Sequence, residues 1–442
     1  MSFKKNIRTA KSIFIFSLPI IAGQIGQMLF GVGDMLVAGR YSSLAVASIG
    51  VAAMTFAPFL MIGIGVLLCT GPLASQARGR GEEDPSLLYN AYRLSFALSV
   101  ILTLILFSAP LYVHLLKLTP EITPHVIDFL QITSFSLFPA FIYQATKDYL
   151  QANGHTFAPN AIILFFNVVN VLLNILFMFG YGSFEGFGIK GAAIATLMCR
   201  YFMAIAVFFY MKSVMKFKTV KNNQTVKTII KLGAPISFTI LCEVLIFTVV
   251  TILVGGMSLV AGAAQSLVIN ITSLSFMVPL ALGSSISVLV GEQFGKKSLT
   301  GIKQQSKGAM TLTLIIQIFF AIVYLAIPHE VMGLATNDQA VITYGATLLF
   351  WVGIFQIPDG LQVVLSGIMR GLNETRIPMF LGLISYWIIG LPIGAYLAYT
   401  GKMEARGLWI GLAIGLSCMC VFLLAFYRNR IKKLAHLHPD HH

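Results

Sequence analysis

Charged residues are scarce in this chain of 442 residues. Only 10% of the residues are Asp, Glu, Lys or Arg, whereas 57% are apolar, and the mean hydropathy is +0.85. A soluble domain of this length has no interior large enough to hide so much apolar surface. The composition therefore excludes a soluble globular protein and favours an integral membrane protein.

The chain also has little of the residue chemistry that metal sites and enzymes need. Its five cysteines form no C-x-x-C pair and all fall inside predicted spans: Cys69, Cys199, Cys242, Cys418 and Cys420. His329 and Glu330 lack the second histidine of a zinc helix, and no phosphate-binding loop or G-x-S-x-G motif is present. We therefore expect no disulfide, no metal site apart from a transported ion, no cofactor and no enzymatic activity.

Long apolar runs are what the sequence has in abundance. About 20 apolar residues cross roughly 30 Å of hydrocarbon as a helix, and the run that follows residues 1–11 is too long for a signal peptide. We predict an all-α integral membrane protein with 12 transmembrane helices, at residues 12–39, 44–73, 88–116, 124–146, 158–181, 188–211, 228–256, 259–290, 308–327, 341–369, 376–400 and 407–427.

The net charge of +14 reflects orientation in the membrane better than binding to nucleic acid. With both termini in the cytoplasm, 24 of the 30 Lys and Arg residues lie on that side, and one, Arg200, lies in the membrane interior. The cations on the outside are Arg40, Lys117, Lys190, Lys402 and Arg406. We therefore expect a multi-pass protein with cytoplasmic termini and no nucleic-acid partner.

The chain is internally duplicated. A shift of 216 along the sequence superposes Pro19 and Ile20 on Pro235 and Ile236, Gly39 on Gly255, Ser42 on Ser258, Ala45 and Ala47 on Ala261 and Ala263, Met61 on Met277, and Gly79 on Gly295. A shift of 219 superposes Thr156 on Thr375, Pro159 on Pro378 and Gly188 on Gly407. Six spans are an even number, so the repeats are parallel, and two such lobes predict a central cleft.

The duplication predicts the domain boundaries. We expect an N-lobe at 1–211, a basic cytoplasmic linker at 212–227, a C-lobe at 228–428 and a cytoplasmic tail at 429–442. The linker is the most basic stretch of the chain. It is typical of a positive-inside loop lying near anionic lipid.

Two acids of the second half lie where hydrocarbon is expected. Glu243 follows Lys231 by twelve residues and Asp359 precedes Arg370 by eleven, which places each about 16–18 Å into its helix. Pro358 precedes Asp359, so a kink there can expose a backbone oxygen beside a carboxylate. We predict that Glu243 and Asp359 share a proton or a sodium ion, the alternative being that each stays protonated and bonds a neighbouring helix.

A third acid, Asp34, lies in the outer half of the first span. Asn167, Asn170 and Asn174 recur at helical spacing on the fifth span, so their amides share a face. A polar N-lobe cluster that contains Asp34 is one interpretation. The alternatives are a surface pair of Asp34 with Arg40 and, for the amides, simple bonding between helices.

Three segments together resemble the multidrug and toxic compound extrusion (MATE) family, over nearly the whole chain. They are L-P-I-I-A-G-Q-I-G-Q-M-L-F-G-V-G-D-M-L-V-A-G-R in the first span, G-A-P-I-S-F-T-I-L-C-E-V in the seventh, and P-D-G-L-Q-V-V-L-S-G-I-M-R-G-L-N-E-T-R-I-P-M near the tenth. The resemblance implies export of organic cations, hydrophobic drugs or toxic metabolites in exchange for Na⁺ or H⁺, by a monomer in the bacterial inner membrane.

The resemblance also implies residue roles. Glu243 and Asp359 match the C-lobe acids of the NorM-like branch, and Asp34 with Asn170 and Asn174 matches the N-lobe proton or substrate cluster, although a DinF-like branch often has Asp at the position of Asn174. The alternative function is a flippase for a lipid-linked sugar or related amphiphile. One buried cation, Arg200, against three buried anions favours cationic cargo over that alternative.

Overall fold

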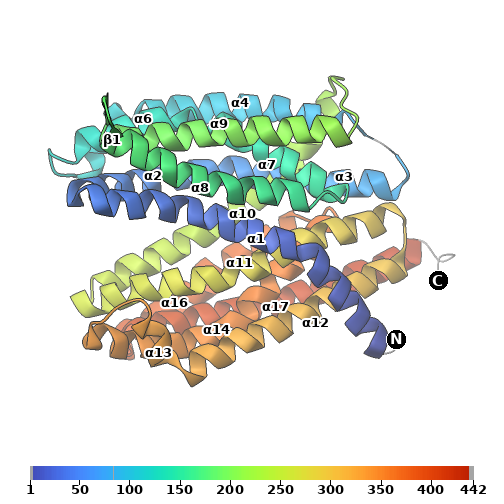
Figure 1. Ribbon diagram of the computed structural model, residues 1–442. Helices are drawn as coiled ribbons and strands as arrows, with labels where there is room; N and C mark the ends of the chain where they lie inside the picture. The colour runs from blue at the N-terminus through green and yellow to red at the C-terminus, as the bar shows by residue number, and fades with distance from the viewer. Residues whose placement is uncertain (1–2, 83, 438–442) are drawn as a thin grey trace. The chain divides into compact units, whose positions relative to one another are not determined.

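The apolar runs form long helices, because a backbone in hydrocarbon must satisfy its hydrogen bonds within the helix. The computed structural model describes residues 3–82 and 84–437 (Figure 1). Among these residues, eleven helices are long and apolar enough to cross a membrane, and α6 (Thr123–Ser134) and α7 (Leu137–Ala152) form a further pair bent by 45°. With that pair taken as one crossing, the twelve predicted spans are confirmed in their predicted order.

The chain packs as two units, and each helix is assigned to the unit in which its residues pack. Unit 2 consists of residues 22–74 and 82–237. It contains α1 (Phe3–Tyr41) from residue 22, α2 (Ser43–Leu67), the first half of α3 (Thr70–Gly79), α4 (Leu87–Phe107), α5 (Ala109–Tyr112), η1 (Val113–Leu116), α6, α7, α8 (Phe157–Phe179), the hairpin strands β1 (Gly180–Tyr181) and β2 (Phe184–Glu185), α9 (Ile189–Val214) and the first part of α10 (Asn223–Gly255).

Unit 1 consists of residues up to 21, residues 75–81 and residues from 238 onward. It contains the rest of α10 with α11 (Leu259–Gly295), α12 (Leu299–Ala326), α13 (Pro328–Gly333), α14 (Gln339–Gly371), α15 (Arg376–Leu383), η2 (Ile384–Gly390), α16 (Leu391–Ala395), η3 (Tyr396–Thr400) and α17 (Ala405–Leu437). The η2 and η3 segments are π-helical.

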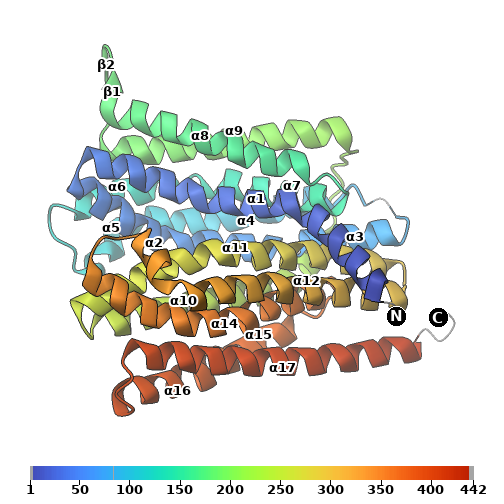
Figure 2. The same cartoon turned by 60° about the horizontal axis from the view of Figure 1, so that its bottom comes forward.

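In unit 1, α11 and α14 lie side by side along much of their length (Figures 1 and 2). The beginning of α1 and the end of α17 lie at the same end of this unit in both views (Figures 1 and 2). An even number of crossings brings the two ends of a chain to the same side, so this placement agrees with twelve spans.

Equivalent residues of the two repeats have the same local structure. Ser42 and Ser258 are both extended N-cap residues, and their side chains accept hydrogen bonds from the amides of Ala45 and Ala261 over 3.0 Å. A side-chain acceptor at this position satisfies one of the free amides of the first helical turn. The duplication seen in the sequence therefore extends to the capping of the helices.

Two equivalent glycines within unit 1 each pack against the backbone of the other repeat. A methyl group on Gly79 would overlap the carbonyl oxygen of Glu292, and a methyl group on Gly295 would overlap the carbonyl oxygen of Gln76. Gln76 and Glu292 are themselves related by the same shift that relates the two glycines. A local two-fold axis produces such a reciprocal contact, because it exchanges Gly79 with Gly295 and Gln76 with Glu292.

Some helix ends differ from the prediction. The third span was expected to reach residue 116, but α4 ends at Phe107 because Pro110 has no amide to continue the helix. The connection between α9 and α10 is shorter than predicted and comprises residues 215–222. The last helix continues to Leu437. The lobe boundaries 1–211 and 228–428 stay a prediction, since packing units and sequence repeats are different divisions of the chain.

Candidate functional sites in the two units

In unit 2, Asp34 belongs to a closed ring of four hydrogen-bonded side chains. Asn174 Nδ2 donates to Asp34 Oδ1 over 2.6 Å and to Asn170 Oδ1 over 3.1 Å. Thr196 Oγ1 donates to Asp34 Oδ2 over 3.0 Å, and Asn170 Nδ2 donates to Thr196 Oγ1 over 3.5 Å. All four residues are buried, so the ring holds a carboxylate away from water with a donor on each oxygen.

Helical spacing and one glycine assemble this ring. Asn170 and Asn174 lie one turn apart on α8 and therefore share a face. Asp34 comes from α1 and Thr196 from α9. A methyl group on Gly33 would lie 3.0 Å from Val171 on α8, so glycine allows α1 to approach α8 closely beside Asp34.

The structure separates the third predicted amide from this ring. Asn167 Nδ2 donates to the carbonyl oxygens of Gly26 and Ile163 over 2.8 and 2.9 Å, so this side chain joins α8 to α1. The alternative of a surface pair between Asp34 and Arg40 is not the arrangement found, because Asp34 is buried within the ring and Arg40 is exposed. Bonding between helices thus describes Asn167, whereas Asn170 and Asn174 contact or adjoin the acid.

Thr196 was missed by the sequence analysis. It is the one threonine of α9, in a stretch that is otherwise mostly apolar. The available signal was its position one turn before Arg200, the intramembrane cation. Arg200 donates to Ser136 Oγ over 2.8 Å and stacks over the ring of Phe56 at 5.0 Å.

In unit 1, Glu243 and Asp359 belong to a second polar cluster. Tyr386 Oη donates to Glu243 Oε1 over 3.4 Å, and Gln362 Nε2 donates to Tyr386 Oη over 3.4 Å. Gln362 also interacts with Asp359, one turn earlier on α14. The two acids come from α10 and α14, so the structure brings together residues that are 116 positions apart in the sequence.

Asp359 has unused hydrogen-bonding capacity. It is buried, and its Oδ1 atom has no hydrogen-bond partner within the described part of the chain. A buried carboxylate oxygen without a partner is costly, which makes a bound proton, ion or water the natural complement. The carboxylates, the Tyr386 hydroxyl and the Gln362 amide oxygen are all hard donors suited to a cation such as Na⁺.

Two further groups border this cluster. The main-chain oxygen of Pro358 accepts a hydrogen bond from Cys420 Sγ over 3.0 Å. Arg370 lies eleven residues after Asp359 on α14, and its positive charge interacts favourably with the Glu243 carboxylate. The π-helical turn of η2 places Tyr386 in the cluster, and such turns are frequent at functional sites.

Buried polar side chains from three helices are hydrogen-bonded to one another next to Asp359. Gln317 Nε2 donates to the carbonyl oxygen of Gln356 over 2.9 Å, and Gln356 Nε2 donates to Ser275 Oγ over 2.8 Å. Tyr324 Oη donates to the same Ser275 oxygen over 2.9 Å. These bonds connect α11, α12 and α14 and fix the turn that precedes Asp359.

One part of the charge argument was wrong. Besides Arg200, which is half-buried, Lys147 of α7 is a buried cation, with its ammonium group 5.9 Å from the centre of the Tyr143 ring. The next residue, Asp148, is buried too and accepts a hydrogen bond from Gln144 Nε2 over 2.8 Å. Both were missed because the fourth span was expected to end at residue 146, whereas α7 continues to Ala152. Since their charges are opposite, the excess of buried anions is unchanged.

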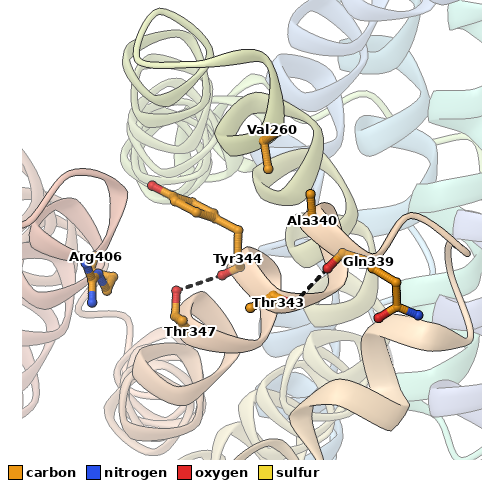
Figure 3. Close-up of a pocket in the computed structure, with 7 residues that line it drawn as sticks. All are labelled: Val260, Gln339, Ala340, Thr343, Tyr344, Thr347 and Arg406. Atoms are coloured by element: carbon orange, nitrogen blue, oxygen red, sulfur yellow. Dashed lines mark hydrogen bonds between the residues drawn. The ribbon is translucent and has the colours of Figure 1, made fainter.

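An open surface pocket of about 530 Å³ lies elsewhere in unit 1 (Figure 3). The first turns of α11, α14 and α17 line it with Val260, Gln339, Ala340, Thr343, Tyr344, Thr347 and Arg406. Tyr344 Oη donates to Glu404 Oε2 over 2.9 Å at its edge. Asp359 lies twenty residues after Gln339 on α14, about 30 Å along the helix, so the pocket is distinct from the acidic cluster.

No group of three or more His, Cys, Asp or Glu side chains gathers at a metal-binding distance in residues 3–82 and 84–437. Long apolar helices with ionisable side chains buried in each packing unit define a polytopic membrane protein with intramembrane polar sites, the class in which transporters are found.

The family model described as MatE matches residues 19–176 and 235–396, and the chain therefore belongs to the MatE family, a family of membrane transporters and not of enzymes. The two matched segments begin at Pro19 and Pro235, which are equivalent positions of the internal repeat.

Curated relatives match along nearly their whole length. The chain is 30% identical to the probable multidrug resistance protein NorM of Acinetobacter baylyi, covering 96% of both chains. It is 27% identical to the multidrug resistance protein NorM of Photobacterium profundum, covering 94% of both. A solved structure of a variant of the Vibrio cholerae MATE transporter VcmN has the same fold, with a TM-score of 0.88 and 20% identity over 97% of this chain and 98% of that one.

Proposed function

We propose that this chain is a secondary antiporter that exports organic cations, hydrophobic drugs or toxic metabolites in exchange for Na⁺ or H⁺. The observation that carries the proposal is the buried Asp359 Oδ1 atom, which lacks a partner among the described residues in a cluster that also contains Glu243. Ionisable groups inside a membrane protein mark ion and substrate pathways. The printed names of the NorM relatives support multidrug export as the class of activity.

In this proposal Glu243 and Asp359 take up the coupling ion. Within residues 3–82 and 84–437, Glu243 receives one long hydrogen bond, of 3.4 Å from Tyr386, and Asp359 Oδ1 has no partner. Both acids therefore have capacity left for one proton or one sodium ion. Binding of the ion neutralises negative charge that would otherwise attract a cationic substrate. Ion and substrate then compete, and competition for the same charge is the basis of exchange.

The ring around Asp34 has the complementary role of a proton or substrate site in the other repeat. Both carboxylate oxygens of Asp34 already accept short hydrogen bonds, of 2.6 and 3.0 Å. Asn174 Oδ1 has no partner in the described residues and remains available as an acceptor. A cation that binds here can use this amide oxygen together with the second lone pair of an Asp34 oxygen.

Transport by alternating access requires the sites to face each side of the membrane in turn. We place the protein in the bacterial inner membrane as a monomer with both termini in the cytoplasm, which the distribution of Lys and Arg supports. Exchange of one monovalent cation for one proton moves no net charge across the membrane. The membrane potential, which is worth roughly 2.3 kcal/mol per charge at 100 mV, therefore does not drive an exchange with that stoichiometry. The stoichiometry therefore decides the driving force.

The test is efflux of a fluorescent cationic dye from proteoliposomes under a Na⁺ gradient or a pH gradient, imposed separately. Wild type should respond to one of the gradients, and Glu243→Gln and Asp359→Asn should each lose the response while their elution profile and thermal stability stay normal. Glu330→Gln is the control, since this acid is exposed on α13. Normal coupled efflux by both cluster variants would refute the role of these acids, and no response of wild type to either gradient would favour a flippase.

A further inference from the structure

The segment between α9 and α10 is bound to unit 2 and is not a free linker. Asn90 on α4 holds it: Asn90 Nδ2 donates to the carbonyl oxygen of Val220 over 3.0 Å, and the amide of Asn222 donates to Asn90 Oδ1 over 2.9 Å. Lys221 lies between these two contacts. Its backbone is therefore held on both sides by one buried side chain.

Asn90 is fully used in this role. Its Nδ2 also donates to the carbonyl oxygen of Ser86 over 2.9 Å, and its Oδ1 also accepts from Arg93 Nη1 over 3.0 Å. Two donors and two acceptor sites are the whole capacity of an asparagine amide. A fully satisfied buried amide costs little and specifies one conformation of the segment.

An aromatic contact holds the other end of the segment. The ring of Phe217 lies 5.9 Å from that of Tyr92, 6.0 Å from that of Phe208 and 6.3 Å from that of Tyr89. The next amide, of Lys218, donates to the carbonyl oxygen of Pro85 over 3.3 Å. We call residues 215–222, held in this way, the strap.

The strap and its flanks present positive charge only. Six lysines occur between positions 212 and 231, and no Asp or Glu occurs between Glu185 and Glu243. Lys218, Lys221 and Lys227 are exposed and make no ion pair with the described residues. Asp84 precedes the Pro85 carbonyl that the Lys218 amide contacts, and its Oδ1 accepts from Ser86 Oγ over 2.6 Å. The six lysines exceed this acid in number, and an excess of like charges is attracted to an anionic surface.

The position of the strap identifies the partner. α9 and α10 are both long and apolar enough to be membrane spans, so the eight residues that join them lie at a membrane face. From these observations we infer that the strap is a binding surface for anionic phospholipid headgroups, on which Lys218, Lys221 and the adjacent Lys227 are held at fixed positions. This inference does not depend on the substrate or on the coupling ion.

A fixed surface differs from an ordinary positive-inside loop in a measurable way. A flexible loop attracts anionic lipid through its total charge alone, whereas the strap requires that the backbone contacts to Asn90 be intact. Removal of those contacts at constant charge should therefore weaken lipid binding. Each lysine near an anionic surface contributes about 1 kcal/mol, which corresponds to about a fivefold change in binding.

The experiment is native mass spectrometry of the full chain in detergent, titrated with phosphatidylglycerol or phosphatidylcholine. Three variants are compared with wild type: Lys218→Gln/Lys221→Gln/Lys227→Gln, the equal-charge control Lys297→Gln/Lys303→Gln/Lys307→Gln in unit 1, and Asn90→Ala. We expect wild type to prefer phosphatidylglycerol, the strap triple variant to lose at least about fivefold in affinity for it, and Asn90→Ala to lose several-fold with its charge unchanged. The control should lose less than the strap variant.

Four results would overturn the inference. They are equal binding of the two lipids by wild type, equal losses in the strap and control triple variants, an Asn90→Ala variant that binds like wild type, and complete competition by free inorganic phosphate. Should Asn90→Ala fail to fold, Asn90→Leu serves in its place, because it keeps the net charge and the approximate size of the side chain but removes the contacts to Val220 and Asn222. Symmetric detergent micelles make all these results independent of membrane orientation.

Discussion

Replacing Asn174 by leucine should separate the chemistry of the Asp34 ring from its packing. Leucine has the same branched shape as asparagine, but it removes the donor to Asp34 Oδ1 and to Asn170 Oδ1. Hydrogen bonds to charged groups contribute about 1.5–3 kcal/mol, whereas side-chain bonds between membrane helices average about 0.6 kcal/mol. The hydrogen bond to Asp34 is short, at 2.6 Å, and buried. We therefore expect the substitution to remove about 2 kcal/mol of stabilisation from the Asp34 carboxylate.

That loss sets the expected effect on transport. Since each 1.36 kcal/mol changes a rate about tenfold, Asn174→Leu should slow efflux about thirtyfold if the ring must hold the carboxylate during the limiting step. The assay is the initial rate of dye efflux from proteoliposomes, per mole of protein that elutes as a single species. Thermal stability in detergent is measured on the same samples, so that a folding defect is recognised as such.

Asn167→Leu is the matched control. It makes the same substitution two turns earlier on the same helix, where the amide bonds only the backbone oxygens of Gly26 and Ile163. Its efflux rate should stay within about threefold of wild type, as the average membrane bond implies. Equal slowing by the two variants would mean that the amides of α8 serve packing alone, and wild-type rates in Asn174→Leu would remove the ring from the mechanism.

Two further predictions concern other contacts. Thr196→Val keeps the shape of the side chain but removes the donor to Asp34 Oδ2, so efflux should fall about tenfold and Thr196→Ser should restore it; a valine variant as active as wild type contradicts this. Gly367→Ala should lower the free energy of unfolding by about 1–3 kcal/mol, because its methyl group would overlap the carbonyl oxygen of Gly283 on α11. Gly31→Ala, which meets no neighbouring atom within 4 Å, should be neutral or stabilising in the same denaturation assay, and equal behaviour of the two glycine variants would argue against the close packing.

The substitution of both acids in unit 1 bears on a different question from the lipid experiment. Loss of coupling in Glu243→Gln and Asp359→Asn would assign the ion site, whatever lipid surrounds the protein. Loss of lipid binding in the strap variants would leave that assignment untouched. The two proposals can therefore fail independently.

The sequence by itself determined the membrane class, the number and order of the spans, the duplication and the presence of Asp34, Glu243 and Asp359 within spans, although it missed the buried Asp148. These properties depend on composition and on distance along the chain, because hydrocarbon demands long apolar helices and penalises every charge placed inside them. Ser42 and Ser258 were paired by a single constant shift along the sequence, and both are N-caps in the structure. The helical spacing of Asn170 and Asn174 likewise fixed their common face.

Only the tertiary structure decided which residues from different helices meet. Thr196, Tyr386 and Gln317 are ordinary polar residues in apolar helices, and nothing near them in the chain shows that they contact Asp34, Glu243 or the turn before Asp359. The binding of the strap by Asn90 joins residues 130 positions apart. Such contacts depend on how helices are rotated and how deep they lie, and these quantities are set by packing against neighbouring helices, which a one-dimensional pattern does not contain.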